Sequence, residues 1–418
     1  MAALTGVIFD HSSILLAHTG RGPNEIKNLL ESITAAGLRT IVFTTHSQPI
    51  NEQLSALGYP PVDLILTQLD VGKRKGSPDW IYEAARRLEC EPYQFLCVGD
   101  DELMWRSAIN AATIYIHSGW SAPLPERVTA LMADTPAAVW RFLTHFLLQP
   151  PRWEYSLDHT EEALFFRSLL GSDVRLPATK TEPPRTPPSF TLQDVFTYDI
   201  KVRVGSLKAV DVLMLHAMTS LYLEGLIRPN SLFAVYPSSK PGKISPLLKE
   251  FLKPASRLFH GYFKEDLLVR ATQAVDSSLE KANARRENRR PNIPDTNQTN
   301  TVHINPAYRR TLQGRPVIVF DDFTTTGQSL EWARNLLYSA GASQVILLTI
   351  GKYPKPHAVH RLKPLAGVRP FERGEYVFSE LFDKYEIVLT RNRDAQRAIT
   401  NSFQYMINKQ PLPLTCSS

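Results

Sequence analysis

The amino-acid sequence predicts an α/β protein built from two doubly wound domains. Two stretches alternate short apolar runs with amphipathic helical patterns: residues 1–117 and the part that begins near residue 190. Short apolar runs are typical of strands buried on both faces of a parallel sheet. A proline-rich stretch separates the two patterns. Because proline cannot continue a helix, this stretch is predicted to be an extended linker. The expected division is 1–149 for the first domain, 150–189 for an extended linker, 190–355 for the second domain and 356–418 for an extension that packs on the core.

In the first domain, strand and helix signals follow one another without a break. The expected strands are Val7–Phe9, Thr40–Phe43, Val62–Leu66, Phe95–Val98 and Thr113–Ile116. The expected helices are Asn24–Ala36, Pro49–Leu57, Pro78–Leu88, Glu102–Ala111 and Pro136–Leu148. In such a sheet, functional loops are expected at the carboxyl ends of the strands.

Those strand ends carry the residue types that phosphoryl transfer needs. A carboxylate can act as nucleophile, a hydroxyl can bind phosphate, a lysine can neutralise charge and further acids can hold Mg²⁺. The candidates are Asp10 as nucleophile and metal ligand, Thr44 and Thr45 for phosphate, Lys75 for charge, and Asp100 and Asp101 for Mg²⁺.

The order of these residues resembles that of the haloacid dehalogenase-like (HAD) hydrolases, on the segments VIFDHSSIL, KGSPDWIYEAA and FLCVGDDELMWRSAINAA. The resemblance implies a Rossmann-like domain with Asp10 as nucleophile. The chain departs from the family at Ser12, where an Asp usually serves as general acid and base, and at Ile14 and Met104. About 34 residues separate Asp10 from Thr44, which leaves no room for a cap domain. The alternatives are an active phosphatase and a degenerate domain that binds phosphate or acts as a scaffold.

In the second domain, the stretch 316–341 combines three features of an anion site. A short apolar strand is expected at Val317–Phe320 and a helix from Leu330 to Ala340. The backbone N–H groups at a helix N-terminus lack internal partners and favour negative charge. The residues between strand and helix are two acids, which suit sugar hydroxyls or Mg²⁺, and a hydroxyl-rich turn: Asp321, Asp322, Thr324, Thr325, Thr326, Gly327 and Ser329. The stretch therefore predicts a site for a phosphorylated sugar.

This string resembles the 5-phosphoribosyl-1-pyrophosphate (PRPP) motif of type I phosphoribosyltransferases, which Asp321, Asp322 and Thr325–Gly327 match. The resemblance implies that the acids contact the ribose hydroxyls and that the turn holds the 5-phosphate. The loop after the expected strand Leu232–Tyr236 stands where that family binds pyrophosphate, and its candidate residues are Ser238, Ser239 and Lys240. This loop lacks the arginine that the family often has there, and the alternative is an ordinary surface turn.

A basic run at 281–290 and the polar stretch after it resemble the corresponding part of ComF-like phosphoribosyltransferases, over about 230–352. The run is expected to be helical, and the alternative is a solvated helix face. Its bases are Lys281, Arg285, Arg286, Arg289 and Arg290. Further expected elements are a short helix within 157–170, a helix at Ser206–Leu226, strands at Gln344–Ile350 and Tyr385–Leu389, and a helix at Asp394–Ile407.

The composition bears on the type of ligand, the compartment and membrane insertion. The formal charge is +6 with 47 basic and 41 acidic residues, which argues only weakly for nucleic acid and suits polyanionic small substrates as well. Three cysteines without metal-ligand spacing favour a reducing, cytoplasmic compartment. The chain has no 18-residue apolar run, so no membrane span is expected.

The function expected from these features is that of a bifunctional, Mg²⁺-dependent enzyme. It would transfer phosphoribosyl from PRPP to an acceptor, and its HAD-like domain could remove the product's 5-phosphate. Two alternatives remain at this point: a non-catalytic sensor of PRPP or nucleotides with a HAD-like scaffold, and a ComF-like DNA-associated protein, for which the basic run is the support. The sequence fixes neither the acceptor nor the oligomeric state.

Overall fold

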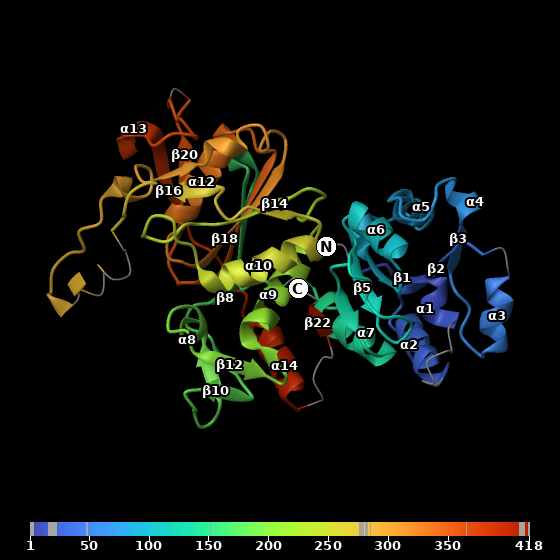
Figure 1. Ribbon diagram of the computed structural model, residues 1–418. Coiled ribbons are helices and arrows are strands. Elements are labelled where there is room, and N and C mark those ends of the chain that lie inside the picture. Colours follow the sequence, from blue (N-terminus) through green and yellow to red (C-terminus); the bar gives the residue numbers. More distant parts are fainter. Residues whose placement is uncertain are drawn as a thin grey trace.

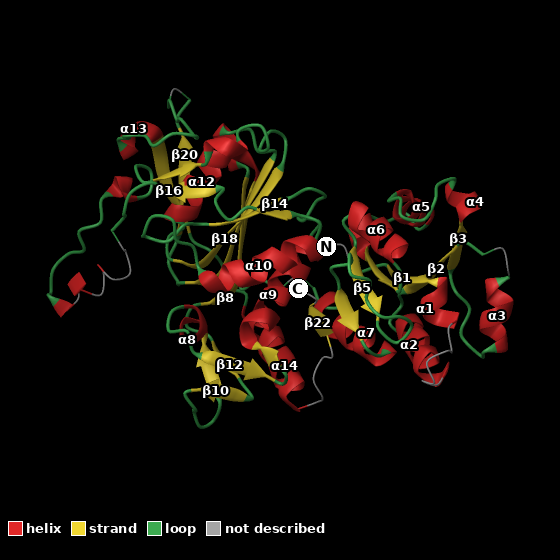
Figure 2. Cartoon of the chain, viewed as in Figure 1, coloured by secondary structure: helices red, strands yellow, loops and turns green. Residues whose placement is uncertain are grey.

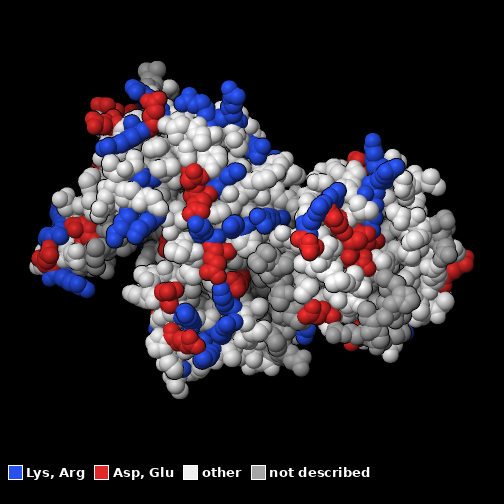
Figure 3. Space-filling view, viewed as in Figure 1, with Lys and Arg blue, Asp and Glu red and all other residues white. Residues whose placement is uncertain are grey.

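A computed structural model describes residues 4–15, 23–46, 49–150, 152–275, 280, 283–284, 286–364, 366–408 and 414–416. The chain forms two α/β units that lie side by side (Figure 1), each with strands flanked by helices (Figure 2). No helix in these ranges is long and apolar enough to cross a membrane. On the face shown in Figure 3, basic and acidic side chains are interspersed and form no continuous surface of one sign.

The N-terminal unit is built on a seven-stranded sheet with the order β22-β6-β5-β4-β1-β2-β3. Its neighbours pair in parallel except for β22, which runs antiparallel to β6 and so brings the end of the described chain back to this sheet. The strands are β1 (Gly6–Asp10), β2 (Arg39–Thr44), β3 (Leu64–Thr67), β4 (Phe95–Gly99), β5 (Ile114–Ser118), β6 (Leu131–Ala133) and β22 (Leu414–Cys416). The five strands expected in this unit are confirmed, with shifts of one or two residues at their ends.

Successive residues of β1 face opposite sides of the sheet, as strand geometry requires. Val7 and Phe9 pack into the core that holds α2 and α7, whereas Ile8 packs into the core that holds α5 and α6. Helices therefore cover both faces, as predicted. The helices are α1 (His11–Leu15), α2 (Pro23–Ala35), α3 (Ile50–Ala56), α4 (Gln68–Val71), α5 (Asp79–Arg87), α6 (Glu102–Asn110) and α7 (Pro136–Phe142), and α7 continues into a π-helical turn, η3 (Leu143–Leu147).

The C-terminal unit is built on a six-stranded sheet with the order β15-β14-β18-β19-β8-β7. All neighbours are parallel except β7, which is antiparallel to β8. The strands are β7 (Tyr155–His159), β8 (Leu164–Gly171), β14 (Leu232–Val235), β15 (Tyr262–Phe263), β18 (Pro316–Thr324) and β19 (Gln344–Lys352). Helices α9 (Ala209–Leu223) and α10 (Pro246–Leu258) pack on one face, and α12 (Gln328–Ser339) packs on the other.

The extended linker predicted at 150–189 is wrong for much of its length. The short helix predicted within 157–170 is present only as a 3-10 turn, η4 (Thr160–Glu162). The strands β7 and β8 lie in this stretch and form one side of the C-terminal sheet. Leu164 and Phe166 are fully buried, because β8 pairs with β19 along Ile346–Lys352. The pairing partner lies about 180 residues away in sequence, so local composition gave no sign of it. After β8, the chain forms a small β-rich subdomain with β9 (Arg175–Pro177), β10 (Lys180–Glu182), β11 (Ser189–Thr191), α8 (Leu192–Phe196), β12 (Lys201–Val204) and β13 (Leu207–Lys208).

Helix α9 joins the two units because it is apolar on all sides. Its residues are buried with the exception of Asp211, and Tyr222 is 1% exposed. The Tyr222 hydroxyl donates to the carbonyl of Phe95 at 2.6 Å and accepts from the backbone N–H of Ile114 at 3.3 Å, so it bridges two strands of the N-terminal sheet. A helix that is hydrophobic all round needs partners on every side. The two units consequently share one continuous core.

The C-terminal extension predicted at 356–418 contacts both units: β22 joins the N-terminal sheet, and the preceding elements lie on the C-terminal unit. The antiparallel pair of β20 (His357–Leu362) and β21 (Phe382–Ile387), with α13 (Phe378–Leu381) in the connection between them, lies against α12. Helix α14 (Arg393–Asn408) contacts β9 and β12. A hairpin joins β16 (Leu268–Arg270) to β17 (Val302–Ile304). The basic run lies between these last two strands; Lys281 and Arg285 are outside the described residues, and Arg289 pairs with Glu280 and Glu287 at 2.5 Å each.

A buried charge cluster holds the β20–β21 pair to α12. Glu331 is fully buried and accepts hydrogen bonds from Arg334 at 2.7 Å and from the His360 backbone N–H at 3.0 Å, and His357 lies 3.1 Å from its other oxygen. Burial alone would raise the Glu331 pKa, but the contacts with His357 and Arg334 lower it from 4.5 to about 2. The folded protein therefore stabilises the ionised form of Glu331 relative to the unfolded chain.

Glu331→Gln is expected to lower the free energy of unfolding at neutral pH by about 3 kcal/mol, the size of the pKa shift expressed as energy. Because the folded pKa is depressed, this contribution is present above pH 4.5 and is lost as the pH falls toward 2. Urea unfolding of both proteins across that range measures it, and the difference should shrink steadily. Glu372→Gln removes an exposed partner of Arg369 and serves as the control, with an expected loss below about 0.5 kcal/mol. A difference that does not change with pH would contradict the role of the Glu331 charge.

Candidate functional site

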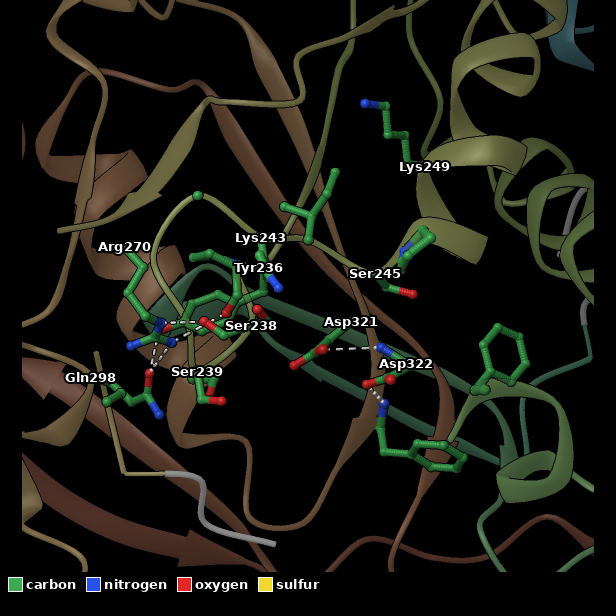
Figure 4. Close-up of a pocket in the computed structure, with 18 of the residues that line it drawn as sticks. Tyr236, Ser238, Ser239, Lys243, Ser245, Lys249, Arg270, Gln298, Asp321 and Asp322 are labelled. Carbon is green, nitrogen blue, oxygen red and sulfur yellow. Dashed lines mark hydrogen bonds between the residues drawn. The ribbon is translucent and has the colours of Figure 1, made fainter. Parts of the chain in front are cut away.

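One cavity of about 810 Å³ lies at the carboxyl ends of β14 and β18 (Figure 4). These strands are adjacent and parallel, and Val235 pairs with Phe320. The segment after β14 and the acids at the end of β18 therefore meet at one edge of the sheet. The polar and charged lining residues are Tyr236, Ser238, Ser239, Lys243, Ser245, Lys249, Glu265, Arg270, Gln298, Asp321, Asp322 and Ser329.

The two acids lie on β18 itself, which corrects the prediction that the strand ends at Phe320. The strand continues to Thr324 because β19 pairs with it up to Lys352. The Asp321 carboxylate accepts from the backbone N–H of Asp322 at 3.0 Å, and Asp322 accepts from that of Phe323 at 2.7 Å. Burial raises the pKa of both carboxyls, and the neighbouring Asp322 charge raises that of Asp321 further. Two neighbouring carboxyl groups whose pKa values are raised by burial at the edge of a cavity are typical of a functional site.

The hydroxyl-rich turn lies beside the cavity without lining it, except for Ser329. Thr324 belongs to the strand, the Thr325 carbonyl accepts from the buried Lys352 ammonium at 2.7 Å, and the Thr326 carbonyl accepts from the Ala358 N–H at 2.8 Å. Gly327 precedes α12 with φ 85° and provides no side-chain cap. The first N–H groups of α12 thus keep their capacity to bind an anion. In the loop, Ser238 and Ser239 line the cavity and Lys240 does not.

Gly327→Ala is expected to destabilise the protein by about 2–3 kcal/mol, because the left-handed backbone disfavours a side chain and a methyl group would clash with the fully buried His357 ring. Gly242→Ala is the matched control: Gly242 also has a positive φ, of 67°, but its Cβ would meet no atom within 4 Å. This control should lose about 1 kcal/mol for the backbone alone. Urea unfolding gives both values, and equal losses would mean that the His357 contact does not constrain the turn.

The sequence did not single out Tyr236, Ser245, Lys249, Arg270 or Gln298, although they line the cavity. They come from three segments that only the folded chain brings together. Arg270 offered the one usable signal, since it ends a short apolar strand before a polar stretch.

The second group of candidate residues lies at the carboxyl ends of β1, β2 and β4. The Lys75 ammonium is 2.5 Å from the Asp10 carboxylate and 2.9 Å from that of Asp101. Asp10 is 3% exposed and Lys75 is 9% exposed. Thr44 ends β2 one position beyond Phe43, which pairs with Asp10, and Thr45 follows it. The structure thus brings Asp10, Lys75, Asp100 and Asp101 together, with Thr44 and Thr45 at the same sheet edge.

Burial dominates the ionisation of this group. It raises the Asp10 pKa to about 7, against the opposing effect of the Lys75 charge. Burial by itself would lower the Lys75 pKa, but the charges of Asp10 and Asp101 outweigh it and the pKa is raised. A lysine that stays protonated between two carboxylates can also neutralise a phosphate placed beside it.

One comparison with known proteins covers most of the N-terminal unit. Residues 11–117 match the family model described as haloacid dehalogenase-like hydrolase. The N-terminal domain is HAD-like.

Solved structures similar to the HAD-like domain cover about a third of the chain or less. A HAD-superfamily hydrolase from Geobacter sulfurreducens is 15% identical over 34% of this chain and 100% of its own, with a TM-score of 0.26. CbbY from Rhodobacter sphaeroides, solved in complex with phosphate, is 30% identical over 27% of this chain and 53% of its own, with a TM-score of 0.25. The core domain of a phosphoglycolate phosphatase homologue from Streptococcus pneumoniae is 18% identical over 34% and 97%, also with 0.25. No functionally curated protein matches the chain.

The acids of the HAD-like domain suit a divalent metal ion. Oxygen atoms of Asp10, Asp100 and Asp101 lie within 4.8 Å of one another. Carboxylate oxygens are the ligands that Mg²⁺ prefers. The donor set therefore fits Mg²⁺, although Asp101 also caps α6 by accepting from the Met104 N–H at 2.6 Å.

The HAD-like domain departs from an active phosphatase at Ser12. The Ser12 hydroxyl donates to the Asp100 carboxylate at 2.5 Å. A serine hydroxyl cannot serve as general acid or base at neutral pH. Ser12 consequently holds a candidate metal ligand in place of supplying a proton.

Proposed function

We propose that the protein is a PRPP-dependent phosphoribosyltransferase fused to a HAD-like phosphate site. One observation carries the proposal: the loop predicted for pyrophosphate and the acids predicted for ribose, about 80 residues apart in sequence, line the same cavity. The parallel pairing of β14 with β18 is the cause, since it directs both segments to one edge. The cavity volume of about 810 Å³ is in the range of small-molecule sites.

Different residues of the cavity would bind different parts of PRPP. Asp321 and Asp322 accept hydrogen bonds from the ribose hydroxyls, the N-terminus of α12 with Ser329 takes the 5-phosphate, and the loop with Ser238 and Ser239 takes the diphosphate. The C1–oxygen bond of PRPP breaks through an oxocarbenium-like state, the bonding pair leaves with the diphosphate, whose charge Mg²⁺ would help to neutralise, and the acceptor's lone pair forms the new bond to C1. Such a reaction needs positioning and charge more than side-chain chemistry. Figure 4 shows the acids facing the loop across the cavity.

In the HAD-like domain, we propose that an Asp10 carboxylate oxygen attacks the phosphorus of a phosphate ester while Lys75 neutralises the phosphoryl oxygens and Thr44 binds one of them. The ester P–O bond breaks, the leaving alkoxide takes a proton from water, and a second water hydrolyses the aspartyl phosphate and frees Asp10. Mg²⁺ held by Asp10, Asp100 and Asp101 would supply further positive charge there. The substrate that fits the fusion is the 5-phosphate of the phosphoribosylated product, and hydrolysis would leave a ribosylated acceptor and inorganic phosphate.

A second candidate function is a PRPP sensor without turnover. The Ser12–Asp100 hydrogen bond favours it, because the position beside Asp10 provides no acid–base group.

The test is pyrophosphate release by the full-length protein from PRPP and Mg²⁺ with candidate acceptors, alongside calorimetry of PRPP binding. Release that depends on an acceptor supports the transferase. Micromolar binding of PRPP without release under any acceptor favours the sensor. Absence of PRPP binding would refute both.

A further inference from the structure

The side chain of Arg270 stands out because it is buried without an acid partner. Arg270 is 3% exposed. Within the described part of the chain, no carboxylate oxygen lies within 4.0 Å of its guanidinium group, and its hydrogen bonds go to neutral acceptors (Figure 4). Buried arginines are normally paired, since an uncompensated buried charge is costly. The nearest counter-charge is across the cavity, where the charge of Arg270 opposes the rise in the Asp321 pKa without forming an ion pair.

The contacts of Arg270 fix the loop that follows β14. Its guanidinium donates to the carbonyls of Pro237, at 3.2 Å, and of Ser238. The Ala274 N–H donates to the Ser239 carbonyl at 2.9 Å from the same side. In a planar trans peptide, the carbonyl and the next residue's N–H point in opposite directions. The N–H groups of Ser239 and Lys240 are therefore turned away from the β16–β17 hairpin.

The other hydrogen-bond partners of Arg270 fix the orientation of its guanidinium group. The Thr301 hydroxyl accepts at 2.6 Å and the Gln298 amide oxygen at 3.0 Å. Gln298 also accepts from the Tyr236 hydroxyl at 2.8 Å, and the guanidinium carbon lies 5.8 Å from the centre of the Tyr236 ring. All these partners are neutral, so the fixed charge stays available to a ligand in the cavity.

We propose that Arg270 is the positioning residue of a diphosphate subsite. It orients the Ser238–Lys243 loop so that backbone N–H groups and hydroxyls face the ligand, and its buried charge gains an ion-pair partner when the diphosphate is bound. The proposal rests on the proposed transferase function and adds a specific prediction to it. The Arg270 subsite contributes to binding of the diphosphate part of PRPP and not to binding of the ribose 5-phosphate part. It also makes the β16–β17 hairpin part of the site.

The test is calorimetry of the full-length protein with Mg²⁺ against three probes: PRPP, inorganic pyrophosphate and ribose 5-phosphate. Arg270→Met is expected to weaken PRPP and pyrophosphate binding about 10-fold or more, the effect of losing hydrogen bonds to a charged group. Ribose 5-phosphate should change by less than about 2-fold, because that part of the cavity is untouched. Arg270→Lys keeps the charge but not the fork and should fall between wild type and Arg270→Met.

Two further variants separate charge from structure. Gln298→Glu keeps Arg270 in place and gives it a carboxylate partner, so the protein should fold while pyrophosphate binding weakens about 10-fold. Arg257→Met removes an exposed arginine of α10 outside the cavity and should change no affinity.

Several outcomes would overturn the inference. Equal losses for ribose 5-phosphate and pyrophosphate in Arg270→Met would indicate a merely structural arginine. So would unchanged pyrophosphate affinity in folded Gln298→Glu. If the wild-type protein binds neither PRPP nor pyrophosphate, the proposed function itself fails and the subsite fails with it, and this result differs from a wild type that binds both while the variants lose nothing.

Discussion

Replacing Asp321 and Asp322 together by asparagine is expected to weaken PRPP binding about 100-fold or more and to leave the protein folded. Each carboxylate is expected to contribute a hydrogen bond to a ribose hydroxyl, and bonds to charged groups contribute about 1.5–3 kcal/mol each. Calorimetry with PRPP and Mg²⁺ measures the loss.

The same double variant should be at least as stable as the wild type. Burial raises the pKa of both carboxyls, which means that the fold holds the ionised forms at a disadvantage. Asparagine keeps the shape and removes the repulsion between the two acids. Urea unfolding should therefore show no loss of free energy, and opposite effects on stability and binding are the signature of residues kept for a ligand.

Asp394→Asn is the matched control, because its carboxylate is exposed on α14 and pairs with Arg397 of the same helix. It should alter neither PRPP affinity nor stability. Unchanged PRPP affinity in a folded Asp321→Asn, Asp322→Asn protein would refute the ribose assignment. A large loss of stability would mean instead that the acids support the sheet.

The sequence allowed the architecture of the N-terminal domain to be predicted because its signals are local. Each strand is short, apolar and bounded by helical periodicity, and β1, β2, β4 and β5 appear within two residues of their expected limits. The constellation of Asp10, Lys75, Asp100 and Asp101 followed from the rule that loops meet at the carboxyl ends of parallel strands. The Ser12–Asp100 hydrogen bond could not be predicted from the sequence, because it joins side chains 88 residues apart.

The C-terminal unit shows where local signals fail. The sequence around β8 (LFFRSLLG) fits a strand or a helix, and only its pairing with β19 decides between them. The same strand β19 extends β18 to Thr324 and thereby places Asp321 and Asp322 inside the sheet. Arg270 shows this limit for the site, since its partners Pro237, Ser238, Gln298 and Thr301 come from both sides of it in the chain.

The shared core bears on how the two candidate sites could act together. Tyr222 on α9 bridges β4 and β5 of the HAD-like sheet. Helix α9 packs against β8, β19 and α10, and α10 packs against β14 and β18, whose ends form the cavity. A packed core transmits strain rather than absorbing it. The two candidate sites are therefore carried on one framework.

Ser12→Asp is expected to raise the turnover of p-nitrophenyl phosphate in the presence of Mg²⁺ by about 100-fold. General acid–base assistance contributes about 10²–10⁴-fold, and the lower end applies because the new carboxylate lies beside Asp100. The unmodified protein should turn over generic phosphate esters slowly, since Ser12 provides no proton. Without Mg²⁺, the variant should also be less stable, because it adds a fourth acid near Asp10, Asp100 and Asp101 and removes the hydroxyl that donates to Asp100.

Ser12→Asn provides the matched control, because asparagine has the shape of aspartate and no ionisable group. It should show no gain, and adding Asp10→Asn to Ser12→Asp should abolish the gain by removing the nucleophile. Steady-state kinetics at saturating Mg²⁺ distinguishes these variants, and thermal unfolding with and without Mg²⁺ shows whether the metal restores the stability of Ser12→Asp. If Ser12→Asp is folded and binds Mg²⁺ but turns over no faster than Ser12→Asn, the HAD-like domain is a scaffold. If the unmodified protein is already fast and Asp10→Asn abolishes its activity, another group supplies the proton and the account of Ser12 is wrong.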